Sequence, residues 1–365
     1  MSNELLRAEN MTVGYGGVPL IRDIALSVSG GEILTLIGPN GSGKSTILKS
    51  LIRELALLGG TVYLDGRDSR RLSANETART LAVMMTGRLT PERMTCWNVA
   101  AAGRYPYTGR LGLLGAEDRE KVREALALVH AEDFADRDFA CVSDGQRQRI
   151  LLARAICQQP RVLVLDEPTS FLDIRYKLEL LTILKKLVRE QNVAVVLSLH
   201  ELDLAQKISD RVVCVKNGEI TCIGIPEEVF ANGSVRELYG LTAGSYDERF
   251  GSLELEPVRG EPQALVVGGG GSGIALYRAL QRQAVPFAAG VLHESDMDFP
   301  VASALACEVV SEQPYQPISD AAFSRAQAIM RRCRRVYAPL RAFGPMNEKN
   351  RELIAEAEAN GWLCR

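Results

Sequence analysis

Hydrophobic residues in this chain follow two kinds of pattern. Residues 32–37, 161–165 and 193–198 are mostly apolar runs, as expected of parallel strands that are covered on both faces. Residues 117–130 and 146–157 instead carry apolar side chains three and four positions apart, which predicts helices with one buried face. The order of these segments predicts an α/β fold with a central parallel sheet.

The N-terminal part of the chain predicts further subdivisions. Residues 5–28 contain short strand-like runs separated by Gly14-Tyr15-Gly16-Gly17 and by Pro19, which favours an antiparallel β subdomain. A strand is expected at residues 81–85, and the pattern is helical from about residue 86 to residue 160. We therefore expect residues 1–243 to form one domain that contains a helical subdomain.

The C-terminal part predicts a second, smaller domain. Residues 244–262 have the glycine, proline and charge content of a linker with one short strand at most. Strands and helices alternate again in residues 263–365, which predicts a small Rossmann-like α/β domain. Strands are expected at residues 264–267, 287–292 and 335–338, and helices at residues 274–283, near 301–307, and at 321–333 and 347–359.

Composition agrees with two domains and narrows the class of partner. The chain has 365 residues, more than one hydrophobic core commonly supports. Its 43 basic and 45 acidic residues give a net charge of −2 without a long run of either sign, so we expect no nucleic-acid binding. No export signal and no apolar run of about 18 residues is present. The eight cysteines lack a C-x-x-C pair, which favours reduced thiols in a cytoplasm.

One short motif predicts the chemistry. The segment Gly38, Pro39, Asn40, Gly41, Ser42, Gly43, Lys44, Ser45 and Thr46 matches the pattern G-x-x-x-x-G-K-[ST]. A strand at residues 32–37 precedes it and a helix is expected at residues 45–55, so backbone N–H groups and the helix N-terminus would face phosphate oxygens. Lys44 is expected to reach the β- and γ-phosphates, and Ser45 to bind Mg²⁺. The motif therefore predicts a nucleoside triphosphate site.

Two carboxylates follow another buried strand. Asp166 ends the run at residues 161–165, and Glu167 comes next. Asp166 is a candidate for a second contact to Mg²⁺, and Glu167 for polarising the water that attacks the γ-phosphate. An acidic pair after a strand is also common in surface loops, so this pair is weak evidence by itself.

The segment Val142-Ser143-Asp144-Gly145-Gln146 completes a family pattern. With the phosphate loop and the acidic pair, it resembles the signature of the ATP-binding subunit of ABC transporters, although Val142 and Asp144 depart from the commonest form. The resemblance implies that Ser143, Gly145 and Gln146 bind the ATP held by a second copy of the chain. We expect the Asp144 carboxylate to turn away from phosphate; a helix-capping role for it stays open.

Other positions fit the same resemblance, which covers residues 4–243. Asp173 resembles the acidic member of the loop through which two subunits sense each other, and His200 the histidine that contacts the γ-phosphate. Tyr15 resembles the aromatic residue that stacks on adenine, with a plain turn tyrosine as the alternative. Thr86 stands where the family has a glutamine that contacts Mg²⁺ and water, and its shorter hydroxyl is expected to alter coupling to the transporter more than nucleotide binding.

The type of transporter is also suggested by resemblance. Gly103-Arg104-Tyr105-Pro106-Tyr107 and residues 167–173 and 198–205 resemble subunits that serve importers of iron-siderophore complexes, haem and cobalamin. The resemblance implies a homodimer around two ATP molecules, bound to separate permease subunits at the cytoplasmic face of the membrane. A substrate-binding protein would act indirectly. The competing hypothesis is a soluble ABC-type ATPase without a permease.

A second glycine loop lies in the C-terminal domain. Gly268, Gly270 and Gly273 match G-x-G-x-x-G between a strand and a helix, and Glu294 lies where a ribose contact would be needed. Three readings stay open: a tight turn without ligand, a site for phosphate or for a nucleotide such as NAD, and a sensor of a metal or metal chelate. The metal sensor would use four residues, His293, Glu294, Asp296 and Asp298. We expect a regulatory role in the second and third cases.

Overall fold

The computed structural model describes residues 3–85, 93–109, 112–231, 233–248 and 251–364. The chain divides into two compact units, Met1–Tyr239 and Gly240–Arg365. Each unit has its own hydrophobic core, so each is described separately below.

A six-stranded sheet forms the centre of the first unit. In sheet order its strands are β10 (Glu219–Gly224), β9 (Arg211–Lys216), β3 (Ile33–Ile37), β8 (Ala194–Ser198), β7 (Val162–Asp166) and β6 (Leu81–Met84). All neighbouring pairs are parallel except β9 and β10. Every residue of β3, β7 and β8 is buried. The predicted parallel sheet with both faces covered is confirmed.

An antiparallel sheet accompanies the central one. Its order is β2 (Val18–Ser29), β1 (Glu4–Tyr15), β4 (Gly59–Leu64) and β5 (Arg67–Asp68). The antiparallel prediction is confirmed, but the short runs are in fact two strands of 12 residues each. Gly14 and Pro19 pair across the hairpin, and a side chain at Gly14 would meet the Val18 carbonyl oxygen at 2.0 Å. The turn-like residues therefore belong to the strands, where the two backbones approach closely.

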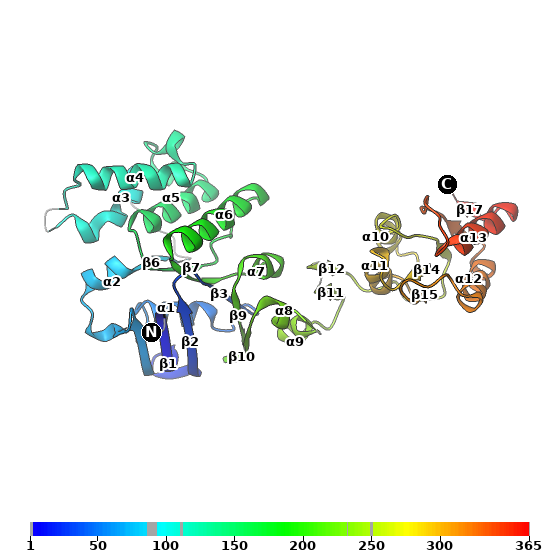
Figure 1. Cartoon of the computed structure of the whole chain (residues 1–365), viewed down its shortest axis with the longest axis horizontal. Coiled ribbons are helices and arrows are strands. Elements are labelled where there is room, and N and C mark those ends of the chain that lie inside the picture. The colour runs from blue at the N-terminus through cyan, green and yellow to red at the C-terminus, as the bar shows by residue number, and fades with distance from the viewer. Residues whose placement is uncertain (1–2, 86–92, 110–111, 232, 249–250, 365) are drawn as a thin grey trace. The chain divides into compact units, whose positions relative to one another are not determined.

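The helices of the first unit vary in length. They are α1 (Lys44–Leu51), α2 (Ala74–Thr80), α3 (Cys96–Ala101), α4 (Ala116–Leu128), α5 (Asp144–Cys157), α6 (Ile174–Gln191), α7 (Leu202–Ile208), α8 (Pro226–Val229) and α9 (Ser234–Tyr239). Short 3₁₀ turns lie at η1 (Ser69–Arg71), η2 (Ala102–Tyr107), η3 (Glu132–Phe134) and η4 (Phe139–Cys141). Figure 1 shows α3, α4 and α5 gathered as one group beyond the β6 edge of the sheet. The predicted helix at 45–55 ends earlier, at Leu51, because Arg53 adopts a left-handed φ of 64°.

The motif around Arg104 joins the helical group. The Arg104 side chain is 3% exposed and contacts Asp118 of α4 at 3.0 Å. It also donates to the carbonyl of Cys157 at 2.8 Å and to Gln159 at 2.9 Å, at the end of α5. A side chain at Gly103 would meet the Arg154 carbonyl oxygen at 2.1 Å. Glycine and arginine at these two positions thus allow η2 to lie directly against α5.

The second unit is built on a five-stranded parallel sheet. In sheet order the strands are β15 (Glu308–Glu312), β14 (Phe287–His293), β13 (Ala264–Val266), β16 (Val336–Tyr337) and β17 (Leu363–Cys364). The helices are α10 (Ile274–Arg282), α11 (Asp298–Leu305), α12 (Asp320–Cys333) and α13 (Glu348–Ala359). Numbered from β13, the strand order is 3-2-1-4-5, the Rossmann order. The predicted small α/β domain is present, with β15 and β17 as strands that the sequence did not predict.

The predicted linker contains a hairpin. Residues 244–262 include β11 (Ser245–Asp247) paired antiparallel with β12 (Ser252–Glu254). Glu254 forms a bidentate ion pair with Arg278 of α10. These residues group with the second unit, and the two units divide between Tyr239 and Gly240, earlier than the predicted end of the first domain at residue 243.

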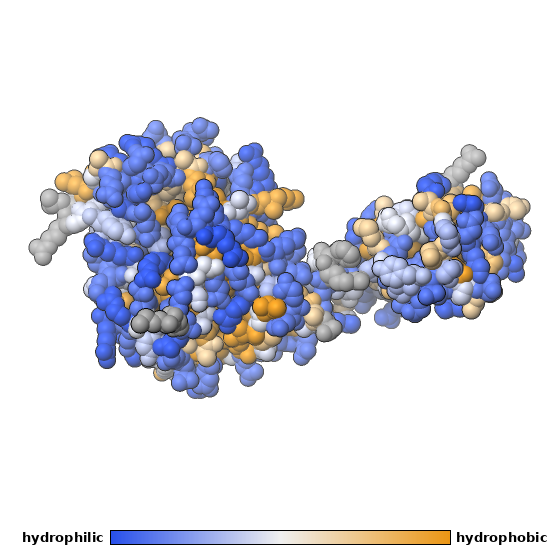
Figure 2. All heavy atoms as spheres, in the orientation of Figure 1, coloured by the Kyte–Doolittle hydropathy of each residue, from blue (hydrophilic) through white to orange (hydrophobic). Residues whose placement is uncertain are grey.

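Hydrophilic residues cover most of the face seen in Figure 2, and hydrophobic ones form small patches between them. Among the residues that the structure describes, no helix has the length and apolar character needed to cross a membrane. The eight cysteines all lie within the described ranges and are free thiols.

Candidate functional site

The phosphate loop lies between β3 and α1, and its lysine is held inward. Lys44 is buried, and its Nζ donates to the carbonyl oxygens of Gly38 at 2.7 Å and of Pro39 at 3.0 Å. Burial lowers the pKa of Lys44, although the charges of Glu167 and Asp166 act in the opposite direction. The ammonium group is thus positioned at the mouth of the loop, next to both carboxylates.

The backbone of this loop has the shape that a phosphate group needs. Gly38, Gly41 and Gly43 have φ values of 147°, 77° and 109°, which side-chain-bearing residues rarely adopt. The Ser42 hydroxyl is buried and has no hydrogen-bond partner within the structure. An orphaned hydroxyl in a loop of left-handed glycines fits a phosphate oxygen, which would supply the missing partner.

Tyr15 reaches the loop from the end of β1. Its side chain is 54% exposed, and its hydroxyl lies 3.2 Å from the Thr46 hydroxyl at the start of α1. An exposed ring beside the first turn of α1 is available for stacking on a flat ligand.

Asp166 ends β7 and connects three segments. Its Oδ1 accepts from Ser45 Oγ at 3.1 Å and from Ser198 Oγ, at the end of β8, at 2.7 Å. Strand β7 lies next to β8 in the parallel sheet, so the carboxyl ends of the strands bring these groups together. Ser45 and Asp166 together could hold a cation with hard oxygen ligands, such as Mg²⁺.

Glu167 and His200 meet above the same sheet edge. His200 Nε2 lies 2.5 Å from Glu167 Oε1, and Ser170 Oγ donates to the other carboxylate oxygen at 3.3 Å. Glu167 has a left-handed φ of 48°, and its N–H donates to Ser198 Oγ at 2.9 Å. A strained backbone held by a neighbouring hydroxyl is typical of a functional site. Glu167 and His200, two separately predicted site residues, are therefore brought together within one chain.

The signature residues cap α5. Ser143 Oγ accepts from the Gln146 N–H at 3.3 Å, and Gln146 Oε1 accepts from the Ser143 N–H at 3.1 Å, which makes a reciprocal capping box. The Ser143 hydroxyl proton stays available as a donor, because the hydroxyl accepts in this contact. Asp144 points outward, 64% exposed, toward Arg147 at 3.2 Å. The helix-capping alternative is wrong, because Ser143 is the cap; whether Asp144 turns away from phosphate stays a prediction.

Asp173, Gly145 and Thr86 are the other predicted positions. Asp173 is exposed and caps α6 by accepting from the Tyr176 N–H at 3.0 Å. Gly145 lies beside the residues that precede Asp173. A side chain at Gly145 would come within 3.7 Å of Leu172 and of the Phe171 carbonyl. Thr86 lies outside the described residues.

Several contacts of the site were not predicted from sequence. The Gly38 N–H donates to the Tyr239 hydroxyl at 3.2 Å, although 201 positions separate the two residues. Ser198 bridges Asp166 and Glu167, and Glu201 contacts Thr169. Ser198 and Glu201 flank the predicted His200 in sequence, which was the available signal. Nothing in the local sequence distinguishes Tyr239 from other helix-terminal tyrosines.

The second glycine loop is filled by side chains of its own unit. Gly270 N–H donates to the Asp296 carboxylate at 2.9 Å, and Gly273 N–H donates to Asp298 at 3.0 Å, at the start of α10. Asp298 is fully buried. A dinucleotide would place its phosphates against these N–H groups, so two carboxylates already hold the position that such a ligand requires.

The four proposed metal ligands are directed to separate partners. His293 contacts the Gln316 carbonyl at 2.8 Å, and Glu294 accepts from Ser311 at 3.3 Å, while Asp296 and Asp298 bind the glycine loop. Among the described residues, no group of three or more histidine, cysteine and acidic side chains could hold a metal ion. The metal-sensor reading is therefore wrong for this part of the chain.

Comparison with known proteins agrees with the geometry. Residues 21–170 match the ABC transporter family, and residues 287–363 match the MJ0874 family. The ABC transporter ATP-binding protein MJ0873 of Methanocaldococcus jannaschii is 42% identical over 278 residues, which are 76% of this chain and 96% of that protein.

Two relatives with named cargoes are also similar. The iron(3+)-hydroxamate import ATP-binding protein FhuC of Bacillus subtilis is 34% identical, over 65% of this chain and 88% of its own. The cobalamin import ATP-binding protein BtuD of Halobacterium salinarum is 31% identical over 322 residues, which are 86% of this chain and 80% of that protein.

A solved structure has the same fold. The cassette MJ0796, solved as a dimer, superposes with a TM-score of 0.55 at 26% identity and covers 60% of this chain and 98% of its own. The phosphate loop, the carboxylates after β7 and the histidine after β8 thus lie in a fold and a sequence that both match known cassettes. The chain belongs to the ATP-binding subunits of ABC transporters, which are ATPases coupled to transport.

Proposed function

We propose that this chain energises an importer of iron-siderophore complexes, haem or cobalamin. The contact between Glu167 and His200, beside the Ser45 and Asp166 pair, carries the hydrolytic part of this proposal. The named cargoes of FhuC and BtuD support the choice of importer. Gly103 and Arg104, which resemble residues of such importer subunits, serve helix packing in this chain.

The roles of individual residues follow from their positions. Lys44 and the loop N–H groups would neutralise the phosphates, and Ser45 with Asp166 would hold Mg²⁺, which supplies charge stabilisation when bound. Glu167 would orient and polarise the attacking water, and His200 would hold Glu167 and contact the γ-phosphate. Tyr15 would stack on adenine.

A second copy of the chain is expected to complete the site. Ser143 and Asp173 are both exposed, and the N-terminus of α5 presents N–H groups and a donor hydroxyl to solvent. A γ-phosphate held by another copy fits those donors. We propose a homodimer in which each α5 faces the phosphate loop of its partner.

The other proposed partners are permease subunits in the membrane and a substrate-binding protein. We propose that permease subunits bind the dimer at the cytoplasmic face, with a substrate-binding protein delivering the cargo from the other side. Thr86 would act in this coupling in place of the usual glutamine. For the second unit, occupation of the glycine loop by Asp296 and Asp298 supports a structural or partner-docking role over nucleotide sensing.

Copurification and ATP hydrolysis test this function. The tagged full chain is purified from membranes, and its ATPase rate is measured with ferric hydroxamate, haem and cobalamin, each with its binding protein. We expect a copurifying permease and a rate that rises with one class of cargo, while Glu167→Gln abolishes hydrolysis. Absence of both a permease and any stimulation would favour the soluble ATPase instead.

A further inference from the structure

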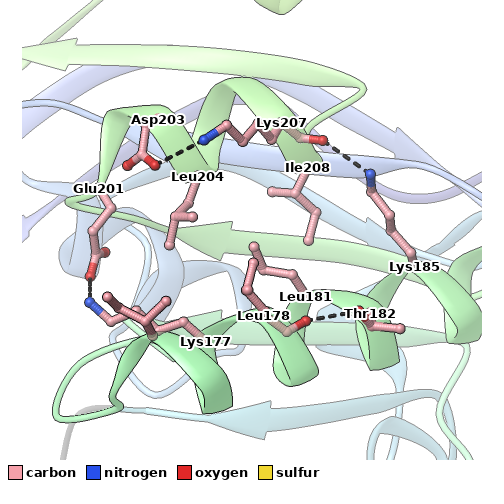
Figure 3. A pocket seen from close by; sticks show the side chains of 11 residues that line it. Lys177, Leu178, Leu181, Thr182, Lys185, Glu201, Asp203, Leu204, Lys207 and Ile208 are labelled. Carbon is pink, nitrogen blue, oxygen red and sulfur yellow. Dashed lines mark hydrogen bonds and ion pairs between the residues drawn. The ribbon is translucent and has the colours of Figure 1, made fainter. Parts of the chain in front are cut away.

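Glu201 connects the histidine segment to two other parts of the first unit. It directly follows His200 and precedes α7, yet its carboxylate does not cap that helix. Instead Oε2 accepts from Thr169 Oγ1 at 2.8 Å, and Oε1 accepts from Lys177 Nζ of α6 at 2.6 Å. Figure 3 shows Glu201 turned toward Lys177 across the groove between α6 and α7.

These contacts form a ring of interactions around Glu167 and His200, which we call the hydrolytic pair. Thr169 lies two residues after Glu167, and Glu201 lies one residue after His200. The Thr169 to Glu201 hydrogen bond and the His200 to Glu167 contact therefore join the same two segments at two points. Thr169 is 1% exposed, so its hydroxyl is fixed by the surrounding packing. Two links between two segments restrict their relative rotation far more than one link does.

Lys177 extends the ring to α6. Its backbone N–H donates to the Asp173 carbonyl at 2.9 Å in the first turn of that helix, and its side chain neutralises Glu201. Burial acts to raise the pKa of Glu201, but hydrogen bonds from Lys177 and Thr169 outweigh it, so the pKa lies below its ordinary value. The carboxylate is thus ionised at neutral pH and able to keep both contacts.

The neighbouring Asp203 shows that this arrangement is specific to Glu201. Asp203 lies in the first turn of α7 and pairs with Lys207, one turn further along, at 3.2 Å. Figure 3 shows this pair running along α7. A carboxylate two positions away therefore offers a matched control that does not touch the hydrolytic pair.

We propose that Glu201 is a positioning residue for ATP hydrolysis, which holds His200 against Glu167 by binding Thr169 and Lys177. This inference rests on the roles proposed above for His200 and Glu167. Glu201 itself does not contact either of those side chains through a hydrogen bond; it acts through the loop that it anchors.

Steady-state ATPase kinetics of the full chain test the inference. Glu201→Ala and Thr169→Val are each expected to lower kcat about 10-fold while KM for ATP stays within about 2-fold, because geometry and not nucleotide binding is disturbed. Asp203→Ala is expected to keep the wild-type kcat. Thr169→Val has nearly the volume of the original residue, so it provides a readout should Glu201→Ala fold poorly.

A double variant separates positioning from general stability. In a His200→Ala background, Glu201→Ala should cause no further loss of kcat, since the residue acts through His200. Wild-type kcat in both Glu201→Ala and Thr169→Val would overturn the inference, as would an equal loss in Asp203→Ala or a full additional loss in the double variant. Unchanged activity of His200→Ala would overturn the proposed site as well, so the two failures are distinguishable.

Discussion

A single tyrosine supports the base of the phosphate loop. The Tyr239 hydroxyl accepts from the Gly38 N–H, and the Gly38 carbonyl in turn accepts from Lys44. Both backbone polar groups of this glycine are therefore engaged, and Tyr239 is connected to the phosphate-binding lysine through one residue. A side chain at Gly38 would meet the Val215 carbonyl at 2.0 Å, so the loop has no room to shift toward β9.

Removal of that hydroxyl should weaken nucleotide binding. Tyr239→Phe keeps the ring but leaves the Gly38 N–H unpaired, and we expect ATP affinity to fall about 3- to 10-fold, as for one lost hydrogen bond. Equilibrium binding of a fluorescent ATP analogue measures the affinity of the variant and of the wild type. Tyr63→Phe, a tyrosine change in β4, is the matched control, and equal affinities for both variants and the wild type would contradict the prediction.

Most residues of the site could be predicted, because short motifs fix them. Lys44, Asp166 and Glu167 follow strands that are recognisable from their apolar runs, and parallel strands bring their carboxyl ends to one edge. Tyr239 could not be predicted, since its contact depends on the path of the chain after β10. Glu201 was adjacent to a predicted residue, but the direction of its carboxylate depends on the packing of α6.

At the scale of elements, the helical group depends on one buried arginine. Arg104 joins η2 to α4 and to the end of α5, and its guanidinium lies 4.0 Å from the centre of the Tyr107 ring. A buried charge with this many partners is costly to leave half-paired.

Loss of Arg104 should therefore destabilise the first unit. We expect Arg104→Ala to lower the free energy of unfolding by about 3 kcal/mol, because Asp118 loses its arginine and the Cys157 carbonyl loses its donor. Arg123→Ala breaks an exposed ion pair with Glu120 on α4 and should cost less than about 0.5 kcal/mol. Urea denaturation compares the two; similar losses for both variants would rule out the special role of Arg104.

Long helices and buried strands could be predicted from their periodicity, whereas several other elements could not. Strands β5 and β17 have two residues each, too few for a pattern to be visible. β15 is a half-buried edge strand with acidic residues at both ends. The hairpin of β11 and β12 was hidden in a polar segment, because its residues are held by pairing and by Arg278 and not by an apolar run.

The whole molecule combines a nucleotide-binding unit with a second unit that has a similar glycine loop. We call this second loop closed, because Asp296 and Asp298 already accept from its N–H groups. In the first unit, the Lys44 ammonium and the unpaired Ser42 hydroxyl are the groups that fit a phosphate. In the second, Asp298 holds the equivalent helix N-terminus. The glycine motif alone could not distinguish an open loop from a closed one. The difference depends on Asp298, which lies 25 positions after Gly273.

Titration of the full chain tests the closed loop. In a Lys44→Ala variant, which disables the first site, we expect no saturable binding of NAD or ATP up to about 1 mM, because phosphate would meet two carboxylates. Isothermal titration calorimetry measures this. Stoichiometric micromolar binding of NAD would restore the dinucleotide reading of Gly268 to Gly273.

The closed loop also has a pH signature. Burial raises the pKa of Asp298, and the nearby Asp296 adds to this, although the Gly273 N–H opposes it. The folded chain therefore binds this proton more tightly than the unfolded chain does, so the contribution to stability is greatest below the ordinary value of 3.8 and is lost as pH rises through the folded pKa.

Asp298→Asn should remove that dependence. We expect the variant to gain stability relative to wild type as pH rises toward neutral, with the difference shrinking toward pH 3.8. Hydrogen exchange of amides in β13 and β14 reports on this unit alone. A stability difference that does not change with pH would show that Asp298 does not titrate on folding.

The contact between the Asp298 carboxylate and the Gly273 N–H at the start of α10 has a consequence for the cell. A Rossmann domain that borrows its anion from a cofactor changes its rigidity with the metabolic supply of that cofactor. A domain that carries the anion as its own side chain is complete as soon as it is synthesised. The glycine loop of the second unit thus has its negatively charged partner from the moment the unit folds.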